Sequence, residues 1–292
     1  MGMSGKMEID NKLIVGDSKD SLKSIEDNTI DSCITDPPYG IGMDHWDNNV
    51  PSVEIWKEVY RTLKPGAFCL SFSSPQLYHK IAAAIEEAGF VIKDQIMWMT
   101  TTKMAKKNYL KPAHEPVVVA QKPFKGSIQD NHDEWSVGKI DTDNTRVPWE
   151  GKPPTGWVKG GHSRRTFGKE GKTTGTQEEF GKENANPAGR YPMNIIGEVM
   201  PEHQKYFYAP RATRKERGEY NNHPTPKPIV LMEYLVKIYC PAGKVVVDPF
   251  CGSGSTGIAA INQGKKFIGI DLDSDYIEIS RKRIKEHCKE II

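Results

Sequence analysis

Hydrophobic residues recur along the chain with two spacings, and each spacing predicts a different element. Short apolar runs such as Ala67 to Phe72 and Val91 to Met99 predict buried strands, and apolar residues three or four apart, as in Val53 to Leu63, predict helices. Runs of the two kinds alternate through residues 12–121 and again from Pro228 onward. This alternation is typical of an α/β fold with a doubly wound, mostly parallel sheet.

The middle of the chain follows neither spacing. Residues 151–190 contain nine Gly and eight Lys or Arg but only six apolar residues, a composition typical of loops. We therefore expect two halves of one α/β domain, at residues 1–121 and 223–292, and a loop-rich insertion between them at 122–222.

Composition and charge exclude several classes of protein. The chain is 37% hydrophobic and 27% charged, as in ordinary globular proteins, and it has no apolar run long enough for a transmembrane helix and no apolar signal segment near Met1. Five scattered Cys without a C-x-x-C pair argue against disulfides or a zinc site, so we expect no metal and a cytoplasmic location. Residues 101–222 carry 21 Lys or Arg against 15 Asp or Glu, an excess that would attract a polyanion.

A glycine-rich segment follows the strand predicted at residues 245–247. Gly252, Gly254 and Gly257 satisfy G-x-G-x-x-G, which lets the backbone approach a nucleoside cofactor at a helix N-terminus, and Asp271 lies where an acid could bind ribose hydroxyls. A plain strand–helix turn is the alternative interpretation. Asp248 places a carboxylate where the pyrophosphate of NAD would lie, so the segment favours a cofactor with a cationic amino-acid end, such as S-adenosylmethionine.

A second motif, Asp36-Pro37-Pro38-Tyr39, follows the strand predicted at Ile30 to Thr35. The prolines would fix Asp36 at the carboxyl end of the strand, where α/β sheets bind ligands. The Asp36 carboxylate and the Pro37 carbonyl offer two acceptors to a primary amine on a conjugated ring, and Tyr39 offers a flat face to stack on that ring. A simple end to the strand would explain the prolines but neither the acid nor the aromatic residue.

Taken together, the two motifs resemble those of the S-adenosylmethionine-dependent DNA amino-methyltransferases, which modify N6 of adenine or N4 of cytosine. The tetrapeptide precedes the cofactor segment, which is the order of the family's beta arrangement. Shorter stretches at residues 15–17, 111–115 and 223–228 agree with the family. The resemblance covers residues 12–121 and 223–292, and implies a Rossmann-like methyltransferase fold in which residues 122–222 form the target-recognition region.

The resemblance also implies roles for individual residues. In the catalytic tetrapeptide, Asp36 and Pro37 would hold the target amine, Pro38 would stiffen the loop and Tyr39 would stack on the base. The residues expected to bind the cofactor are Asp17, Thr225, Lys227, Asp248, Phe250, Gly252, Ser253, Gly254 and Asp271. Among them, Asp17 would lie near the adenine ring and Asp248 near the methionine amine. Asp271, with Asp273 as its alternative, would bind the ribose, and Thr225 and Lys227 would face the methionine carboxylate.

The target amine of such an enzyme lies inside duplex DNA, so the base must leave the stack before it can react. Basic residues of the middle region would contact the phosphates. The candidate contacts are Arg164, Arg165, Arg211 and Arg214. A homodimer and a cognate restriction endonuclease would both fit the family, and the sequence decides neither.

We expect a site-specific adenine N6 methyltransferase, because enzymes that act on cytosine N4 often carry Ser where this chain has Asp36. Cytosine N4 in DNA and adenine N6 in RNA remain as alternative targets. A non-catalytic nucleic-acid-binding module and, on G-x-G-x-x-G alone, a nicotinamide oxidoreductase are alternatives of other classes. The methyltransferase hypothesis requires the loops after residues 35 and 248 to converge on one cleft.

Overall fold

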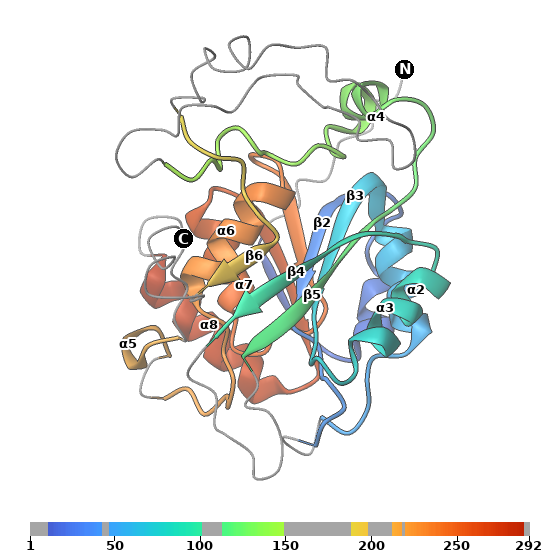
Figure 1. Ribbon diagram of the computed structural model, residues 1–292. Coiled ribbons are helices and arrows are strands. Elements are labelled where there is room, and N and C mark those ends of the chain that lie inside the picture. Colours follow the sequence, from blue (N-terminus) through green and yellow to red (C-terminus); the bar gives the residue numbers. More distant parts are fainter. Residues whose placement is uncertain are drawn as a thin grey trace, which may run out of the picture. The chain divides into compact units, whose positions relative to one another are not determined.

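The computed structural model describes residues 11–42, 47–100, 113–148, 188–197, 212–217 and 220–288. The chain forms two compact units, one made of residues 1–141 and 194–292 and the other of residues 142–193. The larger unit contains the sheet and its helices (Figure 1). In the smaller unit, an antiparallel bridge joins Val147 to Arg190.

The sheet has eight strands in the order β1-β8-β7-β2-β3-β5-β4-β6, and only β5 runs antiparallel to the other strands. The strands are β1 (Lys12–Val15), β2 (Ile30–Thr35), β3 (Leu63–Phe72), β4 (Val91–Met99), β5 (His114–Gln121), β6 (Ile195–Gly197), β7 (Val245–Asp248) and β8 (Lys266–Asp271). The helices of the described residues are α1 (Ser18–Leu22), α2 (Val53–Thr62), α3 (Tyr78–Glu87), α4 (Ile128–Trp135), α5 (Arg214–Arg217), α6 (Ile229–Tyr239), α7 (Ser255–Asn262) and α8 (Ser274–His287). The predicted mostly parallel α/β sheet is confirmed.

Helices cover both faces of the sheet. Residues of α6, α7 and α8 form one apolar core with one face, and residues of α1, α2 and α3 form a second core with the other (Figure 1). Successive strand residues serve the two cores in turn, since Ile34 of β2 packs in the first core and Cys33 in the second. All six residues of β2 are buried, as expected of a central parallel strand.

The two strands that carry the sequence motifs, β2 and β7, are neighbours in the sheet. The chain leads from β2 to β3 on one side and from β7 to β8 on the other, so the strand order reverses between β2 and β7. The side chain of Asp31, in β2, joins the two strands by accepting a hydrogen bond of 2.9 Å from the backbone N–H of Val245. In open α/β sheets, ligands bind at the carboxyl ends of the strands at such a reversal point.

Part of the expected insertion at residues 122–222 belongs to the larger unit. Helix α4 begins at a capping box, in which Ser127 and Asp130 bond each other's backbone N–H groups, and it packs near β3. Strand β6 pairs with β4, and the compact smaller unit spans only residues 142–193. The assignment of residues 122–222 to target recognition stays a prediction.

No helix of the described residues is long and apolar enough to cross a bilayer.

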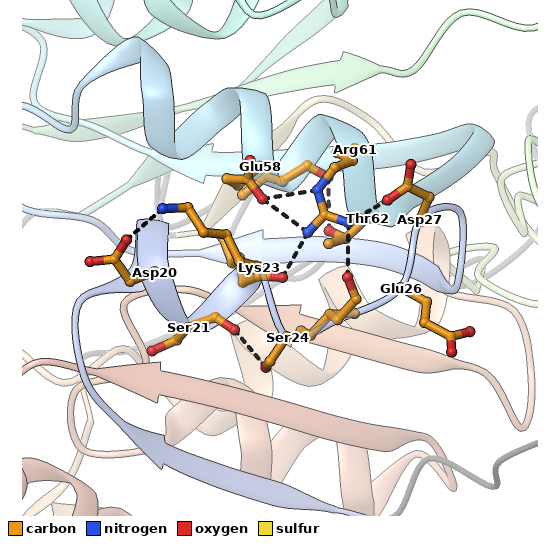
Figure 2. Close-up of polar contacts among 12 residues, drawn as sticks. Asp20, Ser21, Lys23, Ser24, Glu26, Asp27, Glu58, Arg61 and Thr62 are labelled. Carbon is orange, nitrogen blue, oxygen red and sulfur yellow. Dashed lines mark hydrogen bonds and ion pairs between the residues drawn. The ribbon is translucent and has the colours of Figure 1, made fainter.

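A polar network around Arg61 joins α2 to the end of α1 (Figure 2). The guanidinium donates hydrogen bonds to the carbonyl oxygens of Leu22, at 2.8 Å, and Ile25, at 2.9 Å. These carbonyls lie in and just after the last turn of α1, where a helix lacks internal donors. The carboxylates of Asp27 and Glu58 complete the ion pairs of Arg61, which therefore fixes the loop that leads into β2.

We expect Arg61→Met to lower the free energy of unfolding by about 1–3 kcal/mol, because the two carbonyl groups lose a charged donor while the apolar stem is kept. Urea denaturation followed by tryptophan fluorescence measures the change. The matched control is Lys23→Met, which removes a solvent-exposed ion pair to Asp20 and should change stability by less than about 0.5 kcal/mol. Equal effects of the two substitutions would contradict a stabilising role of the Arg61 network.

Candidate active site

The loops after β2 and β7 open into one cleft. Asp36 directly follows β2, Asp248 is the last residue of β7, and both side chains line a cleft of about 320 Å³ that is partly open to solvent. The described residues that line it are Asp36, His223, Thr225, Pro226, Lys227, Met232, Asp248, Phe250, Cys251, Gly252, Ser253, Ser255 and Thr256. The loops after residues 35 and 248 therefore converge on one cleft, as the methyltransferase hypothesis requires.

Four polar side chains contact one another at this cleft, and two of them, Asp36 and Lys227, line it. The Tyr39 hydroxyl donates to Asp36 Oδ1 at 2.6 Å, and the Lys227 ammonium forms an ion pair with Asp36 Oδ2 and donates to the Tyr39 hydroxyl at 3.1 Å. Glu115 Oε2 lies 3.2 Å from the Tyr39 hydroxyl and 3.4 Å from Lys227 Nζ. Because β5 is antiparallel, its first residues reach the edge at which β2 ends, which brings Glu115 to this group.

Burial and the neighbouring charges together raise the pKa values of Asp36, Tyr39 and Lys227. Burial raises the pKa of Asp36; the nearby Lys227 ammonium opposes this increase, and Glu115 adds to it. Burial alone would lower the pKa of Lys227, but Asp36 and Glu115 outweigh burial and raise it, so this lysine is charged at neutral pH. Burial and the two carboxylates raise the pKa of Tyr39 well above its usual value, so its hydroxyl keeps its proton.

The sequence predicted only part of this group. The catalytic tetrapeptide indicated Asp36 and Tyr39 together, whereas we expected Lys227 to face the methionine carboxylate of the cofactor. The structure gives the Lys227 ammonium partners that were not predicted, namely Asp36, Tyr39 and Glu115, while Thr225 lines the same cleft. Contact of Thr225 and Lys227 with the cofactor stays a prediction. Glu115 was not predicted as a site residue, although the stretch at residues 111–115 carried a resemblance to the family.

The glycine-rich segment, which lines the same cleft, turns sharply into α7. Gly252 and Gly254 have φ values of +48° and +80°, a region that favours glycine. A Cβ at position 254 would lie 2.1 Å from Ser280 Oγ, and one at position 252 would lie 2.8 Å from His223 Nε2. Gly254 is the N-cap residue of α7, so the free N–H groups of the first helical turn follow it directly. Both glycines are required by this backbone.

Asp248 is buried beneath this segment, with 2% of its surface exposed. It accepts hydrogen bonds from the Thr35 hydroxyl at 2.7 Å and from the backbone N–H of Phe250 at 3.1 Å. Burial raises its pKa to about 7, although hydrogen bonds from Thr35 and Thr256 favour the charged form. A carboxyl group that titrates near neutrality in a cleft is typical of a binding or catalytic site.

Two further predicted acids lie at the ends of neighbouring strands. Asp271, the last residue of β8, accepts from the backbone N–H groups of Gly252 at 2.7 Å and Asp273 at 3.0 Å, and burial raises its pKa. Asp17, which follows β1, caps α1 by accepting from the N–H of Lys19 at 2.9 Å. Neither Asp17 nor Asp271 is among the described residues that line the cleft. Their predicted contacts with the ribose and adenine stay predictions.

A buried arginine supports the glycine-rich segment. No sequence motif indicated this residue. Arg283, in α8, has no exposed surface and donates to the Ser253 carbonyl at 2.5 Å, the Ser255 hydroxyl at 3.3 Å and the Glu216 carbonyl at 2.8 Å. Burial lowers its pKa to about 10, which leaves it charged at neutral pH. The Arg283 side chain therefore ties the segment to α5. Its position in an amphipathic helix gave no signal of this role.

The predicted DNA contacts lie mostly where the structure gives no description. Arg164, Arg165 and Arg211 lie outside the described residues, and of Arg214 only the helical backbone is described. Pro37 and Pro38 follow Asp36 without regular secondary structure. Within the described ranges, no three His, Cys, Asp or Glu side chains form a group that could hold a metal ion.

A family model and several known proteins match most of this chain. A family model described as DNA methylase, N6_N4_Mtase, matches residues 30–282. The type II methyltransferase M.HpaI of Haemophilus parainfluenzae is 26% identical over 286 residues, covering 94% of this chain and 74% of the relative. The DNA adenine methyltransferase YhdJ of Escherichia coli strain K12 is 27% identical over 287 residues, covering 93% and 82%.

Two solved structures show the same fold. TTHA0409 from Thermus thermophilus, in complex with S-adenosylmethionine, aligns with a TM-score of 0.56 and 20% identity over 96% of this chain and 97% of its own. The cytosine-N4-specific PvuII DNA methyltransferase aligns with a TM-score of 0.58 and 17% identity over 97% and 93%.

We expect Gly254→Ala to lower the affinity for S-adenosylmethionine by about tenfold or more, equivalent to about 1.4 kcal/mol, because the new Cβ forces the segment away from Ser280. Isothermal titration calorimetry measures this affinity. Gly264→Ala is the matched control: Gly264 also has a positive φ, +65°, but open space around its Cβ position. This control should change the affinity by less than about twofold. Unchanged affinity in Gly254→Ala would contradict a cofactor role of the segment.

Proposed function

We propose that this chain, which belongs to the S-adenosylmethionine-dependent DNA amino-methyltransferases that modify adenine N6 or cytosine N4, methylates N6 of adenine at a specific site in duplex DNA. The observation that carries the proposal is the cleft that Asp36 shares with the glycine-rich segment. The relative YhdJ, a DNA adenine methyltransferase, supports adenine as the target. The acid at position 36 supports the same choice.

The residues around the glycine-rich segment fit S-adenosylmethionine. The glycines let the segment pack closely against His223 and Ser280 beside the cleft, and the buried carboxylate of Asp248 would pair with the methionine amine of the cofactor. Phe250, Gly252, Ser253 and Gly254 would line the cofactor, with Asp271 at the ribose, Asp17 near the adenine ring and Thr225 at the methionine carboxylate. When bound, S-adenosylmethionine supplies a methyl group on a cationic sulfur.

The chain's own contribution to the reaction is to hold and polarise the target amine. The lone pair of an exocyclic amine is delocalised into the ring, which makes the nitrogen a poor nucleophile. Hydrogen bonds from this amine to the Asp36 carboxylate and the Pro37 carbonyl would favour a more nucleophilic nitrogen. Positive charge then develops on the nitrogen as it attacks the methyl group, so attraction to Asp36 grows through the reaction. Tyr39 would stack on the base and orient it.

The base must first leave the duplex, at a cost of a few kcal/mol. Contacts between phosphates and the basic middle region, with Arg164, Arg165, Arg211 and Arg214 as candidates, would offset this cost. Cytosine N4 is the second candidate target, because it presents the same pair of N–H groups and the PvuII enzyme shares the fold.

We expect the wild-type protein, incubated with S-adenosylmethionine and duplex DNA, to produce N6-methyladenine, measured by mass spectrometry of the digested nucleosides. Asp36→Ala should lower the methylation rate by about 100-fold or more, because it removes the acceptor that polarises the amine. The affinity of this variant for S-adenosylmethionine should stay within about threefold of wild type. N4-methylcytosine as the product would refute adenine as the target, and full activity of Asp36→Ala would refute the mechanism.

We also expect the affinity for S-adenosylmethionine to fall by about tenfold between pH 7.5 and pH 5.5. The pKa of Asp248 is raised to about 7, so its carboxyl group loses its charge, and its attraction for the cofactor amine, as the pH falls below that value. Calorimetric titrations at several pH values measure the effect. Asp248→Asn should bind more weakly at pH 7.5 and lose most of the pH dependence. The same slope in the variant and the wild type would assign the titration to another group.

A further inference from the structure

Glu115 is a carboxylate of the candidate active site that neither sequence motif supplies. It comes from the first residues of β5, and its side chain is 12% exposed. Its Oε2 atom contacts both groups that hold Asp36, lying 3.4 Å from Lys227 Nζ and 3.2 Å from the Tyr39 hydroxyl. Glu115 therefore reaches Asp36 through Lys227 and Tyr39.

The Lys227 ammonium is shared between two carboxylates. It has three N–H donors, and its partners among these residues are Asp36, Glu115 and the Tyr39 hydroxyl. It also lies 4.9 Å from the centroid of the Phe72 ring, and its side chain is only 6% exposed. This enclosure leaves the ammonium little room to turn to water. The strength of its attraction to Asp36 therefore depends on how strongly Glu115 attracts it.

We propose that Glu115 is a positioning residue for methyl transfer, which draws part of the Lys227 charge away from Asp36 and keeps that carboxylate available to the target amine. The proposal rests on the proposed function, in which Asp36 holds this amine. A carboxylate fully engaged with an ammonium accepts further N–H groups less strongly. Sharing Lys227 with Glu115 reduces that engagement while both partners of the ion pair stay in place.

The charges around Asp36 support this assignment. The groups that face it are Tyr39 from its own loop, Glu115 from β5, Lys227 from the segment before α6 and Asp248 from β7. Burial raises the pKa of Asp36, Lys227 lowers it, and Glu115 raises it. Removing the charge of Glu115 should therefore make Asp36 a weaker base and a weaker hydrogen-bond acceptor.

The test is the single-turnover rate of DNA methylation by Glu115→Gln, at saturating S-adenosylmethionine and duplex DNA, from pH 5 to pH 8.5. We expect the plateau rate to fall by about tenfold and the acidic limb of the profile to move to lower pH by about half a unit or more, because the pKa of Asp36 falls. Affinities for cofactor and DNA should stay within about threefold. Glu115→Asp, which keeps the charge, should recover part of the rate and show a smaller shift.

Glu58→Gln is the matched control, since Glu58 is also a partly buried carboxylate in an ion pair but lies on α2 with Arg61. It should leave both the rate and the pH profile unchanged. A loss of rate in Glu115→Gln without a shift of the acidic limb would overturn the proposal in favour of a purely structural role, and a wild-type rate and profile would overturn it outright. If instead Asp36→Ala keeps its activity, the proposed function fails first, and the two failures are thus distinguishable.

Discussion

The pairing of β2 with β7 is the constraint on which the rest of the site depends. These strands are separated by more than half of the chain, yet they are neighbours in the sheet, and hydrogen bonds from their side chains hold them together at both ends. Asp31 near the start of β2 accepts from the backbone of Val245, and Thr35 at the end of β2 donates to Asp248. Because both strands are parallel and adjacent, the loops that follow them must open at the same edge of the sheet. Without this pairing, the two loops that carry the motifs would not meet in one cleft.

Placing several acids at one edge of a sheet opposes folding, because burial disfavours their charged forms. Burial raises the pKa of Asp36, Asp248 and Asp271, so each of these carboxyl groups is harder to ionise in the folded chain. Hydrogen bonds from Thr35 and from the backbone N–H groups of Gly252 and Phe250 offset part of the cost. A cluster of this kind suits a reaction whose cofactor is a cation and whose nucleophile becomes one. The same burial that destabilises the anions also strengthens their attraction for a cation that enters the cleft.

The sequence predicted the features that depend on local pattern. The apolar run from Val91 to Met99 placed β4 at the bounds that the structure gives, and the two motifs located both loops of the cleft. Strand β3 begins at Leu63 rather than Ala67, because pairing with β2 extends it beyond the apolar run. Strand β6 has three residues, too few for a period, and exists because it pairs with β4. The capping box of Ser127 and Asp130 is a sequence signal for the start of helix α4, but the polar sequence of this helix made the signal hard to recognise.

What the sequence missed in the site are interactions between residues far apart in the chain. Lys227 is 191 residues from Asp36, and no spacing rule connects the two. Their contact nevertheless has a physical reason, which no sequence motif indicates. An ionised carboxylate has about four acceptor positions, and Asp36 uses one oxygen for Tyr39 and the other for Lys227, so each oxygen can still accept another N–H group. Two fixed donors also hold the carboxylate in one orientation before the target arrives. A carboxylate that does not need to reorient as charge develops contributes more to the transition state than a free one, and in this site its neighbours supply that orientation.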